Sequence, residues 1–148
     1  MTNLILITLA LLWSTLPIEK VDRPTPPPFK GDYVGASTFT PADSANYGYA
    51  ETVDIWLRFN DSTYIYGLGD AFPTPEPTPQ YAYGGGPFSH TDSTITFEGP
   101  YPKILRPAVI LNGVFEWTLT ADTLTLAADR ESPIAGQHTV RLILHSTE

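Results

Sequence analysis

The stretch FEWTLTADTLTLAADR, residues 115–130, contains two runs of alternating apolar and polar side chains, one on either side of Ala121-Asp122. Successive side chains of a strand point to opposite faces, so each run predicts a β-strand with one apolar face. A two-residue turn at Ala121-Asp122 places the apolar side chains opposite one another in three pairs: Leu119 with Leu124, Trp117 with Leu126, and Phe115 with Ala128. The stretch therefore predicts an antiparallel hairpin in a single register.

The turn of this hairpin carries a weaker sequence signal than its two strands. A type I′ turn needs positive φ at both central residues, which alanine disfavours, so Ala-Asp is a weaker turn signal than Asn-Gly. A longer loop between the two strands remains an alternative.

Further short alternating segments run along the chain, and no segment shows a sustained period of 3.6 residues. Strands are expected in residues 30–40, in 49–69 on both sides of a turn at 60–62, in 93–99 and in 136–146. Seven or eight short strands joined as neighbouring hairpins predict an all-β fold with little helix. We expect an antiparallel up-and-down barrel of about eight strands, because closure removes exposed sheet edges; a sandwich is the alternative.

Two segments lack a clean period. Residues 71–88 hold five prolines and the run Gly84-Gly85-Gly86, so we expect a long loop with a flexible glycine linker, and at most a short strand at 80–83. Residues 101–113 are expected to form a single helical turn or an irregular crossover.

The N-terminal residues 1–17 resemble a signal peptide. Their apolar run from Leu4 to Leu16 is shorter than the roughly 20 residues of a transmembrane helix and fits a signal-peptide core. Residues 18–29 are rich in proline and predict an extended tether, which leaves 30–146 as the barrel domain. We expect an exported protein, in the periplasm, in the cell envelope or secreted, that meets a membrane only through an uncleaved N-terminal segment. The alternative is a cytoplasmic protein that buries this segment.

Composition excludes several classes of function. The 148 residues include no cysteine, which rules out disulfides, thiolate zinc sites and cysteine nucleophiles. Sixteen acidic and eight basic residues give a net charge of −8, so binding to nucleic acid or to anionic lipid is disfavoured.

Four segments together carry a family resemblance: GDYVG at 31–35, NDSTYIY at 60–66, DSTITFEG at 92–99, and ILNGVFEWTLTADTLTLAAD at 110–129 ahead of HTVRLILHS at 138–146. In this pattern the chain resembles the small lipocalin-like (calycin-type) β-barrel domains of bacterial envelope and secreted proteins. Larger lipocalins carry a Gly-x-Trp motif on the first strand, where this chain has Gly31-Asp32-Tyr33. The resemblance implies a barrel of about eight strands with an interior suited to a small apolar ligand, and it names no ligand.

The sequence offers no catalytic constellation, and we expect no enzyme, metal or cofactor. Five charged residues have the parity opposite to the apolar face and should point outward: Asp54, Arg58, Glu98, Glu116 and Arg141. The strands then place no pair of carboxylates inside, as glycosidase chemistry requires. The three histidines, His90, His138 and His145, are not at metal-ligand spacings.

Two binding hypotheses remain. The candidate residues for an interior apolar ligand are Tyr33, Tyr64, Tyr66, Trp117, Leu126, His138 and Leu142, because tyrosine combines an apolar ring with one polar group. His138 either faces inward at the barrel mouth or lies exposed at a strand end, and the same interior set also suits a filled core. The second hypothesis is a surface for a protein partner, made by Trp56, Ile65, Tyr81, Tyr83 and Phe88. Trp56 faces outward, so either a partner, the N-terminal tether or the 100–112 crossover covers it.

Overall fold

The structure is a computed structural model that describes residues 28–73, 83–99, 111–132 and 136–148. Residues 1–17, most of the predicted tether, residues 80–82 with Tyr81, and residues 101–110 of the expected crossover lie outside the described residues.

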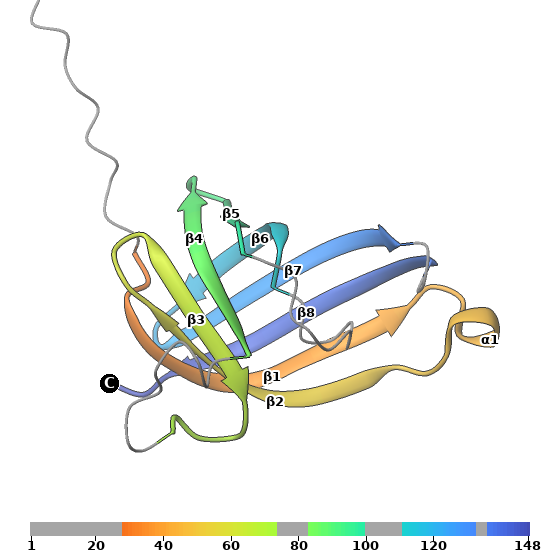
Figure 1. The fold of residues 1–148 in the computed structure, drawn as a ribbon, viewed down its shortest axis with the longest axis horizontal. Coiled ribbons are helices and arrows are strands. Elements are labelled where there is room, and N and C mark those ends of the chain that lie inside the picture. The colour runs from red at the N-terminus through yellow and green to blue at the C-terminus, as the bar shows by residue number, and fades with distance from the viewer. Residues whose placement is uncertain (1–27, 74–82, 100–110, 133–135) are drawn as a thin grey trace, which may run out of the picture.

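Eight antiparallel strands form a closed barrel in which each strand pairs with its sequence neighbours and β1 pairs with β8 (Figure 1). The strands are β1 (Gly31–Pro41), β2 (Glu51–Phe59), β3 (Thr63–Leu68), β4 (Gly84–His90), β5 (Thr94–Phe97), β6 (Gly113–Thr120), β7 (Thr123–Ser132) and β8 (Gly136–Ser146). A single helical turn, α1 (Ser44–Tyr47), follows β1. The predicted all-β up-and-down barrel with little helix is confirmed.

The β6–β7 hairpin has the predicted register. Leu119 pairs with Leu124 and Trp117 pairs with Leu126, and the strands are joined by the two-residue turn at Ala121-Asp122. Ala121 has a φ of 53°, and it is the one non-glycine residue with positive φ in the described part of the chain. Because Asp122 does not share that conformation, the turn is not type I′.

The two ends of the barrel differ. One end, called here the closed end, carries the three short turns 60–62, 91–93 and 121–122. The opposite end, called here the mouth, carries the three longer connections, 42–50, 69–83 and 98–112, and the short connection 133–135 between β7 and β8. β1, β2, β7 and β8 have 9 to 11 residues, whereas β3 has 6 and β5 has 4, so the long strands extend past the short ones at the mouth (Figure 1).

Aromatic rings seal the closed end. The side chain of Phe29 is fully buried, with its ring centroid 4.9 Å from that of Phe59 and 5.1 Å from that of Trp117. The indole N–H of Trp117 donates to the carbonyl oxygen of Thr91 at 3.1 Å, which ties the ring to the β4–β5 turn. Phe29, assigned from the sequence to the tether, therefore belongs to the barrel core.

The prediction of a flexible linker at Gly84-Gly85-Gly86 is wrong. These glycines begin β4 and pair with Tyr66, Ile65 and Tyr64 of β3. A Cβ atom at Gly84 would lie 2.6 Å from the Tyr66 ring, and one at Gly85 would lie 2.6 Å from the Tyr64 carbonyl oxygen. Glycine is required there because the neighbouring strand and its rings occupy the space of a side chain.

Replacing Ala121 by glycine should stabilise the protein. The left-handed conformation costs an L-residue about 1 kcal/mol and glycine almost nothing, so Ala121→Gly should raise the free energy of unfolding by about that amount. Urea denaturation measures the change. Ala36→Gly, at a strand position without positive φ, should lower the same quantity. A loss of stability in both variants would contradict this account of the turn.

Truncating Phe29 should show that the seal stabilises the barrel. Phe29→Ala removes a fully buried ring and should lower the free energy of unfolding by about 3 kcal/mol. The matched change Pro28→Ala, at an exposed neighbouring position, should alter it by less than about 0.5 kcal/mol. Equal effects in thermal unfolding would show that Phe29 acts only as part of the tether.

Candidate functional site

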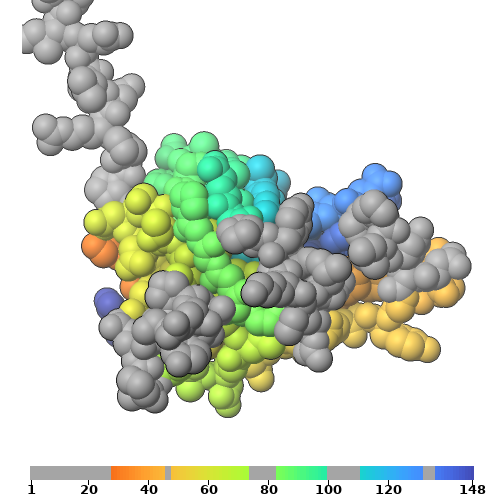
Figure 2. All heavy atoms as spheres, viewed as in Figure 1, coloured from red at the N-terminus to blue at the C-terminus, as the bar shows by residue number. Residues whose placement is uncertain are grey.

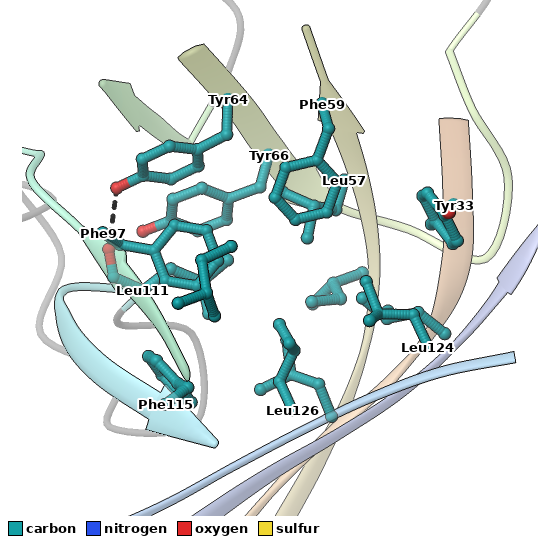
Figure 3. Packing of buried hydrophobic residues seen from close by; sticks show 14 of the residues in the cluster. Tyr33, Leu57, Phe59, Tyr64, Tyr66, Phe97, Leu111, Phe115, Leu124 and Leu126 are labelled. Atoms are coloured by element: carbon teal, nitrogen blue, oxygen red, sulfur yellow. Dashed lines mark hydrogen bonds between the residues drawn. The ribbon is translucent and has the colours of Figure 1, made fainter. Parts of the chain in front are cut away.

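Aromatic side chains fill the barrel between the closed end and its middle. The Tyr64 ring stacks on Tyr66 at 6.1 Å and meets Phe97 edge-on at 4.6 Å, and the Phe97 ring lies 5.5 Å from that of Phe115 (Figure 3). All four of these side chains are at most 1% exposed. This half of the interior is a packed core.

The hydroxyls of the stacked tyrosines are held within that core. Tyr64 donates to the carbonyl oxygen of Leu111 at 2.9 Å, as the dashed line in Figure 3 shows. Burial, helped by the neighbouring Tyr66, raises the pKa of Tyr64 well above its ordinary value. Burial raises the pKa of Tyr66 to about 12, although a hydrogen bond with the Leu111 backbone opposes the shift. Both rings remain neutral at physiological pH.

The predicted interior residues do not form one site. Tyr33 and Trp117 lie toward the closed end, where Tyr33 is 4% exposed and its ring is 6.0 Å from that of Phe59. Burial, and then the nearby Glu148 carboxylate, raises the pKa of Tyr33. His138 lies at the mouth: β1 pairs Tyr33 with Ser146 and Pro41 with His138, a run of β8 that spans roughly 26 Å at about 3.3 Å per residue.

Leu126 and Leu142 lie midway between these ends. The two residues pair directly across β7 and β8, and both are fully buried. Both residues belong to the packed core.

At the mouth the inner face of the barrel is not sealed. Leu68 lies opposite Ile55, on the inner face of the sheet, yet its side chain is 42% exposed. Val53 and Tyr83 pack against the core and are half-buried. These apolar side chains therefore remain partly accessible to solvent at the mouth, as Trp117 and Leu119 do at the closed end.

An arginine that the sequence analysis overlooked points into the same region. Arg130 follows Leu124, Leu126 and Ala128 on the inner face of β7. Its guanidinium lies 4.4 Å over the Phe115 ring, and its Nη2 donates to the carbonyl oxygen of Asn112. The alternation that predicts the hairpin places Leu124, Leu126 and Ala128 on the inner face. The next residue in this series is Arg130, so the sequence also predicts that Arg130 faces inward.

His138 lies directly opposite Arg130 on β8 and also faces inward. Its ring is 8% exposed and lies 5.0 Å from the ring of Phe39. Nδ1 lies 2.9 Å from the carbonyl oxygen of Gly136, so this nitrogen donates the hydrogen bond. Of the two alternatives for His138, the inward one at the mouth is confirmed.

One carboxylate shares the inner face at the mouth. Glu51, at the start of β2, pairs with Phe39 of β1 and is half-buried. Phe39 pairs in turn with Val140, which pairs with Ala128 beside Arg130. At about 4.8 Å between neighbouring strands, Glu51 lies roughly 14 Å around the wall from β7.

A hollow of about 540 Å³ lies where β1, β7 and β8 end at the mouth. Its lining consists of Thr40, Pro41, Ala42, Asp129, Arg130, Glu131, Gln137, His138 and Thr139. These residues come from both faces of the three strands, so the hollow lies at the rim. Figure 2 shows this end of the molecule, where the atoms of β1, β2, β7 and β8 reach beyond those of β4.

Trp56, which was predicted to contribute to a partner surface, is buried. This side chain is 4% exposed: Phe72 covers it with a centroid distance of 5.1 Å, and a Cβ atom on Gly67 would touch its ring at 2.3 Å. The Arg58 guanidinium lies 4.4 Å over the same Phe72 ring and binds the Asp32 carboxylate through two hydrogen bonds of 2.6 and 2.8 Å. Of the alternatives for Trp56, the structure shows a covered side chain, with Phe72 from the segment after β3 packed on it, so Trp56 is not available to a partner.

Phe88 also lies inside the molecule. It belongs to the inner face of β4, is 7% exposed and packs 5.2 Å from Phe59, so its assignment to a surface loop is wrong. Tyr83 packs on the core, 6.0 Å from the Tyr66 ring, and Ile65 is half-buried. Within the described ranges, Ile65 and Tyr83 are what remains of the predicted partner surface.

The other charged side chains lie where the alternation predicts. Asp54, Glu98, Glu116 and Arg141 are exposed, and Arg58 is on the outer face. In the part of the chain that the structure covers, no three histidine, aspartate or glutamate side chains are grouped to hold a metal ion. The same residues include no helix that is long and apolar enough to cross a membrane.

The chain matches no protein-family model, and comparison with curated proteins and with solved structures finds no similar protein.

Because its tyrosines are buried, the protein should lose free energy of unfolding as the pH becomes alkaline. The neutral form of Tyr66 is favoured in the folded state, since its pKa rises from an ordinary 10.0 to about 12. The folded state therefore holds a proton that the unfolded state releases, and its contribution is complete below pH 10 and is lost as pH rises toward 12. Urea denaturation across this window should show the decline, and Tyr66→Phe should make it shallower. An equally steep decline in Tyr66→Phe would contradict the assignment.

Proposed function

We propose that this protein is a non-catalytic binding protein that holds a small apolar molecule at the mouth of its barrel. The molecule would enter between the longer connections and lie above the packed core that contains Leu126 and Leu142. The closed half of the interior, which is filled by aromatic rings, acts as the rigid scaffold of this site.

One observation carries this proposal: the apolar side chains of Leu68 and Val53, on the inner face at the mouth, are partly exposed. Leu68 is 42% exposed and Phe29 is 0% exposed, although both face the interior. Exposed apolar surface on a concave wall is stabilised when an apolar ligand covers it. The charged groups of this wall, Glu51 and Arg130, lie on different strands and give the site polar points for orienting a ligand.

The alternative, a surface module that captures a protein partner through residues 71–88, has less support. Trp56 and Phe88 are buried, so two of its five anchors are unavailable to a partner. Large aromatic side chains at the centre of a contact usually provide most of the energy of protein association. Binding at the mouth is therefore the better supported function.

The proposal includes two broader assignments. The topology and the sequence pattern support grouping the chain with small lipocalin-like domains, whose barrels commonly serve as containers. The signal-like segment at residues 1–17 supports export, so we propose that the ligand is met outside the cytoplasm.

A matched pair of variants tests the site. Ala128 faces the interior and Ala127, its neighbour on β7, faces outward, so tryptophan at these positions fills the mouth in one case and the outer surface in the other. The uncharged dye Nile red should bind the wild type with increased fluorescence. Ala128→Trp should weaken this binding at least tenfold, and Ala127→Trp should leave it within about twofold.

Circular dichroism and urea denaturation should confirm that both variants are folded. Absence of dye binding to the wild type, or equal binding to both variants, would refute a site at the mouth.

A further inference from the structure

We infer that the outer face of β6, β7 and β8 is an interaction surface for a second copy of this chain, and that the two copies form a symmetric dimer. The interface is independent of ligand binding at the mouth, because this face lies on the outside of the barrel wall. The inference starts from a sheet face that is uncharged at its centre and carries opposite charges on its two flanks.

The centre of this face is uncharged, on a chain whose net charge is −8. Its outward positions are Thr118, Thr120, Thr123, Thr125, Ala127 and Ile143. Ile143 is 42% exposed, and Val114, farther along β6, is 58% exposed, so apolar surface is left in contact with solvent there. Two copies of an acidic chain repel each other over most of their surfaces, and an uncharged face allows them to approach.

Opposite charges flank this centre at the same level of the sheet. Glu116 of β6 and Arg141 of β8 both pair with Ala127 of β7, and both are exposed. With about 4.8 Å between neighbouring strands, the two residues lie roughly 10 Å apart on either side of β7. Within the part of the chain that the structure describes, neither side chain forms an ion pair. Both charges are therefore available to a partner.

This placement is self-complementary about one axis. A two-fold axis that runs parallel to β7, between two such faces, exchanges the β6 side of one copy with the β8 side of the other. Glu116 then faces the partner's Arg141, and Arg141 faces the partner's Glu116. The two ion pairs fix the register of the contact, while Thr125 meets its own equivalent near the axis.

Side-chain length matches the curvature of the barrel. The wall is convex, so two such walls touch first along β7, where the outward side chains are short: Thr123, Thr125 and Ala127. The walls diverge over β6 and β8, where the longer side chains of Glu116 and Arg141 span the wider gap. Asp129 is the next outward residue of β7, and the axis would bring it against its equivalent, so the contact ends at Ala127. A contact of this extent is small, and we expect a micromolar dissociation constant.

Charge reversal tests this arrangement. Sedimentation velocity of the wild-type protein at increasing concentration should show an equilibrium between monomer and dimer. Glu116→Arg places two arginines against each other at both flanks, and Arg141→Glu places two glutamates there, so each variant should raise the dissociation constant at least tenfold. An equimolar mixture of the two variants restores opposite charges at both flanks and should dimerise about as tightly as the wild type.

The control Glu98→Arg makes the same change of charge at an exposed position outside this face and should not raise the dissociation constant. Circular dichroism should confirm that every variant is folded. A wild type that stays monomeric at about 200 μM would overturn the inference. Unchanged dimerisation of the two single variants, or a mixture of them that stays monomeric, would overturn it as well.

Discussion

The pairing of β1 with β8 is the constraint on which the remaining architecture depends. These strands, the first and last of the domain, stay in register from Tyr33↔Ser146 to Pro41↔His138. The pairing converts a meander into a closed wall with one inner face, so each strand has a single choice of which side chains are buried. It also makes the two ends of the barrel unequal, because the long strands β1, β2, β7 and β8 lie side by side (Figure 1).

Under the proposed function, that inequality separates the residues that stabilise the barrel from those that would bind a ligand. The short strands and tight turns bring aromatic rings together around Phe29 and Phe59, both of which are buried. At the mouth, Val53 of β2 and Leu68 of β3 are partly exposed on the inner face. A rigid core beneath an open rim allows the rim to vary in sequence without loss of the fold.

Sequence pattern was sufficient where the structure depends on local alternation. Period-two spacing predicts the β6–β7 register, the β2–β3 hairpin and the inward parity of β8. The same spacing also predicts that Arg130 faces inward. Prediction from the sequence pattern failed where the environment of a residue is set by a neighbour that is distant in the sequence. Gly84 and Gly85 resemble a linker until the Tyr66 ring and the Tyr64 backbone are known to occupy the space beside them. For Trp56, which has outward parity, no local pattern shows that Phe72 is the residue that covers it. The sequence pattern also could not show whether the predicted interior residues form one site. Strand parity tells which residues face inward, but it does not tell how far apart they lie along the barrel axis.

The seal at Phe29 has a geometric consequence for the whole chain. The polypeptide enters the barrel at Phe29 and leaves it after Ser146, and both points lie at the closed end (Figure 1). Any surface, lipid or protein to which either terminus is joined would therefore hold the barrel by its base, with the rim directed outward. A molecule diffusing from the surrounding medium would then approach the rim without passing the point of attachment.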